Sequence, residues 1–351
     1  MTNQLTDSLC LSRPIIQAPM AGGITTAELV ISVSEAGALG MIGAGYLDAE
    51  STRHQIREVK AGTRKPFGVN LFVPAPFTIE EDSMKRAQQA LEPFQVKLGA
   101  KNTADFFVSY EQALAVFYEQ VNVIIEEEVP VCSFTFGIPS REVILSLKQN
   151  GTYTIGTATT LAEAQAVEAS GMDAVVMQGS EAGGHRGNFL ADVESSMIGL
   201  MALIPQTVDQ VSIPVIAAGG IMDRRGVQAA ICLGAQAAQL GTAFLTCKES
   251  GANDIHKQAV LERQQEDKTT LTRAFSGKAA RGIENDFIRD MRKMEQELPQ
   301  FPIQNALTKP IRSAAAQNND REAMALWCGQ NPNAAEPITV RELMHKLVDE
   351  A

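Results

Sequence analysis

Apolar residues along this chain follow two alternating patterns. Short continuous apolar runs, such as those at 15–20, 153–158 and 214–218, are each followed by a turn and then by a stretch with apolar residues at helical spacing. A Thr-x-x-Glu pattern, typical of a capping box at a helix start, follows the first two of these runs, at Thr25 and at Thr160. The pattern predicts strands that alternate with amphipathic helices.

The apolar runs are numerous enough to build a barrel. They begin near residues 15, 38, 67, 131, 153, 173, 214 and 237. Near-continuous apolar strands joined by helices indicate a parallel sheet covered on both faces, and eight such units favour a closed TIM-like (β/α)₈ barrel over an open doubly wound sheet. We expect the barrel at 1–76 and 128–249, a helical insertion at 77–127, and a mostly helical substrate-side cap at 250–351.

Composition excludes several classes of protein. Of the 351 residues, 45% are hydrophobic and 20% charged, which suits a sizeable buried core. The net charge of −11 disfavours nucleic acid as a partner, because an acidic surface repels phosphate backbones. No apolar run approaches the ~18 residues of a membrane helix. The N-terminus lacks a secretory signal and the five cysteines are scattered, so we expect a soluble, cytoplasmic protein that binds no membrane. Homo-oligomerisation stays open.

Glycine-rich motifs stand at three predicted strand ends, where barrel enzymes place their active sites. After the first strand, Pro19, Met20 and Ala21 precede two glycines, which let backbone approach a flat ligand closely. Two further motifs follow the last two strands, where barrels often bind phosphate with backbone N–H groups. Packing glycines would explain each motif alone, but together they favour a phosphate site. These motifs consist of Gly219 and Gly220, and of Gln239, Leu240, Gly241 and Thr242.

One histidine lies at the predicted mouth. His185 follows the sixth strand between glycines, and an imidazole there could accept a proton from carbon or hold an anionic substrate. A loop histidine bonded to backbone is the alternative. The other histidines, His54, His256 and His345, lie in charged helical stretches and are expected to be solvated. No histidine pair or cysteine cluster suggests a metal, and neither a dinucleotide-binding nor a P-loop motif is found.

Taken together, these motifs resemble the nitronate monooxygenase family, formerly called 2-nitropropane dioxygenases, and specifically its class I members. The resemblance covers nearly the whole chain. It is carried by QAPMAGG at the start, GVNLFVP at 68–74, GSEAGGHRG at 179–187, AAGGI, QLGT, and SGKAARG at 276–282. It implies an FMN enzyme that oxidises alkyl nitronates with O₂ to a carbonyl compound and nitrite, by one-electron transfer from the nitronate anion to flavin. Propionate 3-nitronate, a toxic metabolite, is the expected substrate.

The resemblance also implies roles for individual residues. His185 matches the family's catalytic histidine, and Tyr110 and Lys309 become candidates for the substrate pocket. The family often carries a tyrosine where this chain has Phe301, which puts substrate hydrogen bonding there in doubt. The implied FMN contacts are Asn70, Gln178, Gly183, Gly220 and the four residues from Gln239 to Thr242.

Two alternatives stay open. An FMN-dependent enoyl-acyl-carrier-protein reductase or NAD(P)H:quinone reductase would share the barrel and the glycine-rich flavin site. A non-redox barrel enzyme acting on a phosphorylated metabolite would share the phosphate site alone. Reduction of the flavin by NAD(P)H separates the first from a monooxygenase, and absence of a yellow cofactor identifies the second.

Overall fold

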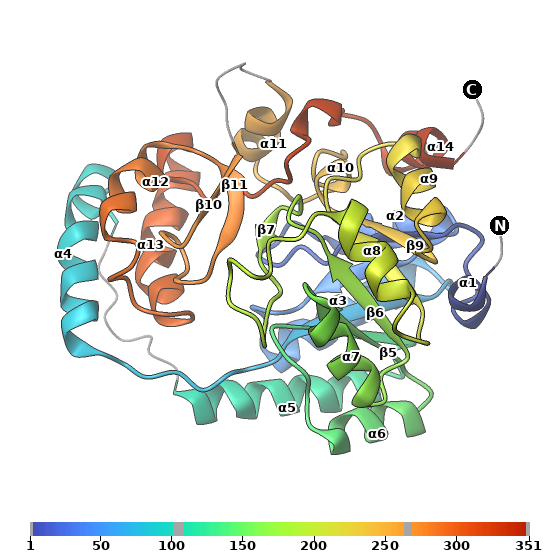
Figure 1. Cartoon of the computed structure of the whole chain (residues 1–351). Helices are drawn as coiled ribbons and strands as arrows, with labels where there is room; N and C mark the ends of the chain where they lie inside the picture. Colours follow the sequence, from blue (N-terminus) through green and yellow to red (C-terminus); the bar gives the residue numbers. More distant parts are fainter. Residues whose placement is uncertain (1–2, 101–108, 263–268, 349–351) are drawn as a thin grey trace.

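Eight parallel strands close into a barrel (Figure 1). The computed structural model describes residues 3–100, 109–262 and 269–348. The sheet runs in the order β1-β9-β8-β6-β5-β4-β3-β2, and it closes where Leu39 N–H donates to the Ile15 carbonyl (3.0 Å) and Gln17 N–H donates to the Leu39 carbonyl (2.9 Å). The predicted strands and the predicted barrel are confirmed. The strands are β1 (Ile15–Gln17), β2 (Gly40–Gly43), β3 (Phe67–Phe72), β4 (Val131–Thr135), β5 (Tyr153–Ala158), β6 (Ala174–Gln178), β8 (Val215–Ala218) and β9 (Ala237–Leu240).

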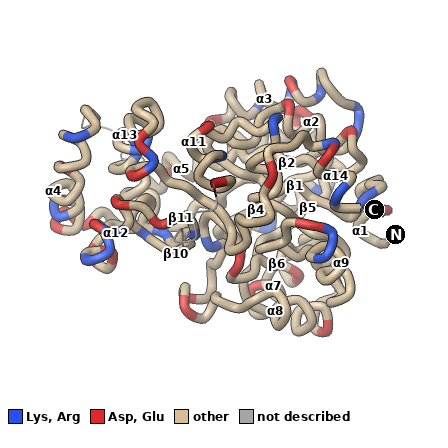
Figure 2. The backbone as a smooth tube through the Cα atoms, turned by 90° about the horizontal axis from the view of Figure 1, so that it is seen from above, with Lys and Arg blue, Asp and Glu red and all other residues tan. Residues whose placement is uncertain are grey.

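The barrel interior is a packed apolar core. None of the eight strands contains a charged residue, and Figure 2 shows Lys, Arg, Asp and Glu mainly on the surrounding helices and loops. Ile16, Met41 and Ile216 are buried in one cluster with Leu5 and Leu9. Because the two leucines belong to or follow the short helix α1 (Gln4–Ser8), the start of the chain packs into the same core as the barrel strands.

Helices surround the sheet, and the end of the chain completes the ring. The last helix, α14 (Val340–Val348), packs against α2 and α9, beside the short helix α10 (Thr242–Leu245) that follows β9. Helix α5 packs against α3, α6 and β3, so it also lies in the ring. The ring helices are α2 (Ala27–Glu35), α3 (Ala49–Gly62), α5 (Tyr110–Glu126), α6 (Arg141–Gln149), α7 (Leu161–Ala169), α8 (Leu200–Val208) and α9 (Arg224–Cys232).

Parts of the two stretches outside the strand–helix repeat meet in one lobe beside the barrel (Figure 1). Helix α4 (Glu81–Leu98) packs against α13 (Ile303–Gln317), which is more than 200 residues away in sequence. A small antiparallel sheet, in the order β10-β11-β7, joins this lobe to the barrel mouth. The boundaries expected at 77–127 and 250–351 stay a prediction. The remaining elements are β7 (Gly184–His185), β10 (Thr269–Thr272), β11 (Ala280–Ile283), α11 (Asp254–Leu261), α12 (Asp286–Met291) and the 3₁₀ turns η1 (Arg292–Met294), η2 (Arg321–Ala323) and η3 (Pro332–Ala334).

Of the two predicted capping boxes, one has its N-cap residue where expected, although the Glu163 side chain accepts from Thr159 instead of returning to the Thr160 N–H. Thr160 caps α7 by accepting the Glu163 N–H, as expected. The first prediction was wrong by one residue: Thr26 caps α2, and the Thr25 hydroxyl accepts instead from Met20 N–H (3.0 Å). Thr25 therefore shapes the turn that carries Met20 to the barrel mouth.

Across the described ranges, no helix is long and apolar enough to cross a membrane.

A buried carboxylate in α7 organises the loop that follows His185. One oxygen of Glu163 accepts the N–H groups of Phe189 (2.6 Å), Leu190 (2.8 Å) and Ala191 (3.2 Å). The other accepts the N–H (2.7 Å) and hydroxyl (2.6 Å) of Thr159. Burial alone would raise the pKa of Glu163, but these hydrogen bonds outweigh burial and hold its pKa below the ordinary value.

We expect Glu163→Gln to lower the free energy of unfolding at pH 7 by about 2 kcal/mol, because the loop N–H groups lose a charged acceptor. A carboxylate with a lowered pKa stabilises the fold fully above its unfolded pKa of about 4.3, and this contribution disappears as the pH falls through the folded pKa. Urea unfolding should therefore separate variant from wild type at pH 7, and the difference should shrink as the pH falls below about 4.3. Glu92→Gln, at an exposed site on α4, is the control. Equal stability of both variants at pH 7 would contradict the role of Glu163.

Candidate active site

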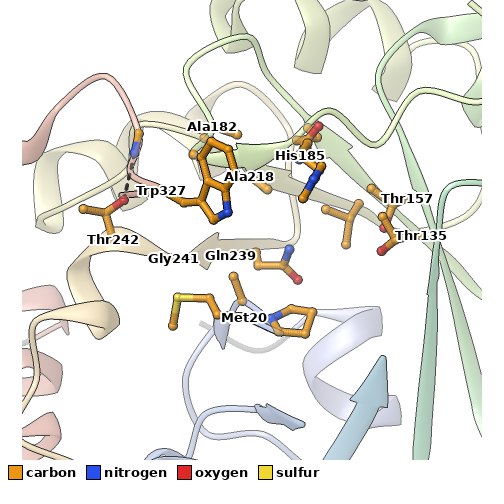
Figure 3. A pocket seen from close by; sticks show the side chains of 18 of the residues that line it. Met20, Thr135, Thr157, Ala182, His185, Ala218, Gln239, Gly241, Thr242 and Trp327 are labelled. Carbon is orange, nitrogen blue, oxygen red and sulfur yellow. Dashed lines mark hydrogen bonds between the residues drawn. The ribbon is translucent and has the colours of Figure 1, made fainter. Parts of the chain in front are cut away.

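A cavity of about 200 Å³ lies at the C-terminal ends of the barrel strands (Figure 3). The rings of His185 and Trp327 and the amide of Gln239 project into it from different parts of the chain. Most residues proposed from the sequence line this cavity. They are Pro19, Met20, Ala21, Asn70, Gln178, Gly183, His185, Gly219, Gly220, Gln239, Gly241 and Thr242.

Three proposed residues do not lie there. Leu240 is buried in the apolar core and does not line the cavity, because alternate residues of a strand face opposite sides. Lys309 is exposed on α13, and Tyr110 is the first residue of α5. Neither side chain lines this cavity or the larger one beside it. The structure thus does not bring the two substrate-pocket candidates to the site.

Strand β11 holds the histidine and the tryptophan side by side. Ala280 pairs with His185 and Arg281 with Gly184 in an antiparallel register. The next residue, Gly282, forms an antiparallel bridge with Trp327. The two ring centroids are consequently 5.6 Å apart. A Cβ on Gly282 would lie 2.7 Å from the Leu326 carbonyl oxygen, so the close approach of this segment requires glycine.

Neighbouring glycines in the histidine loop serve different purposes. A Cβ on Gly183 would lie 2.4 Å from the Cys328 carbonyl carbon and 2.6 Å from the Gly329 nitrogen, so this glycine is needed for contact with the C-terminal segment. Gly184 has a φ of +72°, and its Cβ would stand in open space.

A third glycine, Gly220, follows β8. It has a φ of +64°, and its N–H donates to no group in the described part of the chain. An unpaired N–H at a cavity wall is suited to an anionic ligand.

His185 is uncharged in this environment. Burial, together with the smaller effect of the positive charges of Lys278 and Arg312, lowers the pKa of its imidazole to about 3. Its Nε2 lies 2.8 Å from the hydroxyl oxygen of Ser276. The same hydroxyl donates to the Lys278 carbonyl (3.0 Å), so it is placed to accept a proton from Nε2 and leave Nδ1 as the basic nitrogen. Phe136 and Phe301 contact the ring from the outer side.

The polar side chains of the cavity differ in how many of their hydrogen-bonding groups are already paired within the protein. Gln178 donates to the His185 carbonyl (2.9 Å) and accepts the Gly187 N–H (2.8 Å), so its amide fixes the histidine loop. Asn70 donates to Ser133 (2.8 Å) and Thr135 (3.1 Å). The Gln239 amide has no hydrogen-bond partner among the described residues, which makes it the amide most available to a ligand.

Sequence reasoning missed the C-terminal wall of the cavity. His256 was expected in solvent, but it is buried and its ring Nε2 lies 2.9 Å from the Trp327 carbonyl, which can only accept a hydrogen bond. Gly329 N–H donates to the Thr242 hydroxyl (3.0 Å), which fastens the same segment to the end of β9. The sequence offered two signals for this wall, a histidine within a charged stretch and the single tryptophan. Neither indicates on its own which part of the chain the residue packs against.

A second cavity, of about 940 Å³, adjoins the first on its outer side. Tyr46, Phe72 and Phe136 line both cavities. The outer walls come from the two additions and the histidine loop. They include Pro74, Phe117, Asn188, Arg273, Lys278, Glu295 and Phe301.

This arrangement is that of a barrel enzyme, with its site at the C-terminal ends of the strands and extra segments forming the entrance. The sequence matches the nitronate monooxygenase family profile over residues 3–350. The chain belongs to the nitronate monooxygenase family, whose members are flavin-type oxidoreductases, and its enzyme class is that of a nitronate monooxygenase.

Relatives and solved structures agree with this assignment. A "probable nitronate monooxygenase" of Staphylococcus haemolyticus (strain JCSC1435) is 49% identical over 350 residues, covering 99% of this chain and 96% of the relative. A crystal structure of nitroalkane oxidase from Streptomyces ansochromogenes superposes with a TM-score of 0.89 at 40% identity, covering 98% of this chain and 96% of that chain. FabK from Thermotoga maritima is similar with a TM-score of 0.77 at 31% identity, covering 99% and 95%.

The two adjacent glycines provide a test of how the cavity is built. We expect Gly183→Ala to cost about 3 kcal/mol of stability, because its methyl group collides with backbone atoms of Cys328 and Gly329. Gly184→Ala should cost about 1 kcal/mol, the strain of a left-handed alanine, since no atom opposes its methyl group. Thermal unfolding of both variants measures the difference. A Gly183→Ala protein no less stable than Gly184→Ala would show that the C-terminal segment does not pack as described.

Proposed function

We propose that this protein is an FMN-dependent enzyme that oxidises alkyl nitronates, propionate 3-nitronate among them, with O₂ to a carbonyl compound and nitrite. The observation that carries the proposal is the juxtaposition of a glycine-lined cavity and an uncharged imidazole at one barrel mouth. Family membership supports the reaction class.

The residues present fit a flavin nucleotide. The unpaired Gly220 N–H and the Gly241–Thr242 turn lie at the ends of β8 and β9, where barrels bind phosphate. The Thr242 hydroxyl accepts from Gly329, so its own hydrogen can be directed at a phosphate oxygen. Gln239 offers its amide, and Asn70 its amide oxygen, to the polar edge of a flat ring system, and Met20 and Trp327 offer apolar surface. When bound, FMN would supply the electron-accepting chemistry of the reaction.

The protein's own groups bind and orient the substrate. An uncharged His185 contributes hydrogen bonding and shape, while the nearby positive charge comes from Lys278 and Arg312. A nitronate is already an anion and needs no proton removed. A base with a pKa of about 3 abstracts a proton from a neutral nitroalkane inefficiently. The site is therefore better suited to nitronates than to neutral nitroalkanes. Phe136 and Phe301 exclude water from one side of the imidazole.

Aerobic turnover of propionate 3-nitronate tests the proposal directly. The purified holoenzyme should be yellow, release FMN on denaturation, consume O₂ and produce nitrite. It should be reduced slowly or not at all by NAD(P)H under anaerobic conditions. Rapid anaerobic bleaching by NAD(P)H without nitrite formation would instead indicate the reductase alternative, and a colourless protein would indicate the non-redox alternative.

Replacement of the imidazole should separate chemistry from cofactor binding. We expect His185→Asn to retain FMN and to lower kcat/KM for nitronates by about 100-fold, the usual scale of an oriented hydrogen-bonding or proton-transferring side chain. His54→Asn, an exposed histidine of α3, is the matched control. FMN content by absorbance and nitrite release measure the two properties. Unchanged turnover in His185→Asn would remove this residue from the reaction.

A further inference from the structure

One tyrosine belongs to the walls of both cavities. Tyr46 follows β2, and it is the only tyrosine among the described residues that line either cavity. Its ring packs edge-on against Phe72, with ring centroids 5.3 Å apart. The residue is 42% exposed, yet burial raises the pKa of its phenol, so its exposed surface lies within the cavities rather than in open solvent. The hydroxyl forms no hydrogen bond with the described part of the chain, which leaves it available to a ligand.

The loop that carries Tyr46 is fixed on both sides of the phenol. The side-chain amide of Gln120, buried in α5, donates to the carbonyls of Ala44 (3.0 Å) and Leu47 (2.9 Å). A Cβ on Gly45 would lie 2.4 Å from an aromatic ring of β3, so the close approach of the loop to this ring requires glycine. The phenol is therefore held at the cavity wall before a ligand arrives, which lowers the entropic cost of binding.

Arg312 places a positive charge near this phenol. Its guanidinium, on α13, donates to the hydroxyl of Thr308 (3.2 Å) and to the side-chain oxygen of Asn305 (2.9 Å), and it pairs with no carboxylate among the described residues. Its charge lowers the pKa values of both Tyr46 and His185, although burial is the larger effect on each. Because such interactions weaken with distance, the guanidinium lies near both side chains. A phenol beside a cation is a stronger hydrogen-bond donor.

The imidazole does not supply the donor that a nitronate needs. The two oxygens of a nitronate share its negative charge and only accept hydrogen bonds. His185 directs Nε2 at Ser276, and the remaining Nδ1 of the uncharged ring can accept a hydrogen bond but cannot donate one. Phe136 and Phe301, which contact the same ring, carry no hydrogen-bonding side-chain atom. An anion next to His185 thus requires a donor from another part of the cavity wall.

We propose that Tyr46 is a further substrate-binding residue, whose hydroxyl donates to an oxygen of the nitronate at His185, and that Arg312 is a positioning residue whose charge strengthens this hydrogen bond. The inference rests on the proposed nitronate oxidation and deepens it, because it names the group that recognises the reacting end of the substrate. It depends on no other part of the substrate, so it extends to any alkyl nitronate that fits the cavity.

Removal of a single oxygen atom tests the role of Tyr46 in the holoenzyme. We expect Tyr46→Phe to lower kcat/KM for the nitronate of 1-nitropropane about 10-fold, mainly through KM, since a hydrogen bond to a charged group is lost. Its melting temperature should stay unchanged, because the ring still packs against Phe72. Tyr118→Phe is the matched control: this tyrosine of α5 is also 42% exposed but lines neither cavity, so its loss should leave kcat/KM unchanged.

A double-mutant cycle tests whether Arg312 acts through Tyr46. Arg312→Gln should lower kcat/KM about 5-fold in the wild type and clearly less in the Tyr46→Phe background, since coupled residues give non-additive losses. Arg312→Lys, which keeps the charge, should retain most of the activity. Lys293→Gln, which removes an exposed charge from η1, should have no effect in either background. Equal losses in both backgrounds, or an Arg312→Lys protein as impaired as Arg312→Gln, would overturn the positioning role.

Calorimetric binding of butyrate gives a readout that needs no turnover. Butyrate has the same arrangement of non-hydrogen atoms as the nitronate of 1-nitropropane, with a carboxylate in place of the charged nitro group. Tyr46→Phe should raise its Kd about 10-fold, and Tyr118→Phe should not change it. An unchanged Kd together with an unchanged kcat/KM, or a loss confined to kcat, would overturn the role of Tyr46. A wild type that oxidises no nitronate would refute the proposed function, whereas weaker butyrate binding by Tyr46→Phe would still support Tyr46 as the anion donor.

Discussion

The pairing of β7 with β11 is the interaction on which this active site depends. Two residues of the loop after β6, Gly184 and His185, form a strand only because β11 supplies its partner. That partner lies almost 100 residues further along the chain. The same edge of β11 positions Trp327 through Gly282. Without this small sheet, the barrel would still present its glycine turns, but no imidazole would be fixed above them.

The environment of that strand also decides what the imidazole can do. Burial keeps His185 uncharged, and the positive charges of Lys278 and Arg312 act in the same direction. The shape of the site around the substrate and its positive charge are thus provided by different residues: by uncharged His185, and by Lys278 and Arg312. Glu163 of α7 fixes the part of the loop that follows His185 by accepting hydrogen bonds from three consecutive backbone N–H groups. The loop is accordingly held by the lobe on one side and by a barrel helix on the other.

Much of the architecture could be predicted because it follows from the local order of apolar and polar residues along the chain. Continuous apolar runs gave all eight barrel strands, and glycines at strand ends indicated the cavity walls around Gly220 and Gly241. The contacts made by the additions could not be predicted in this way. Trp327, His256 and Ser276 reach the site through long-range packing that leaves no periodic signal. The misplacement of Lys309 and Tyr110 has the same cause, since residues carried over by resemblance on helical additions shift with the packing of those helices.

A crystal structure of the FMN-bound protein is the most direct measurement of the central claim. The phosphate should lie within hydrogen-bonding distance of Gly220 N–H and the Thr242 hydroxyl, with the isoalloxazine ring between Met20 and Trp327 and next to His185. A phosphate bound away from both glycine turns, or a ring separated from the imidazole by the aromatic wall, would contradict the assignment of this cavity.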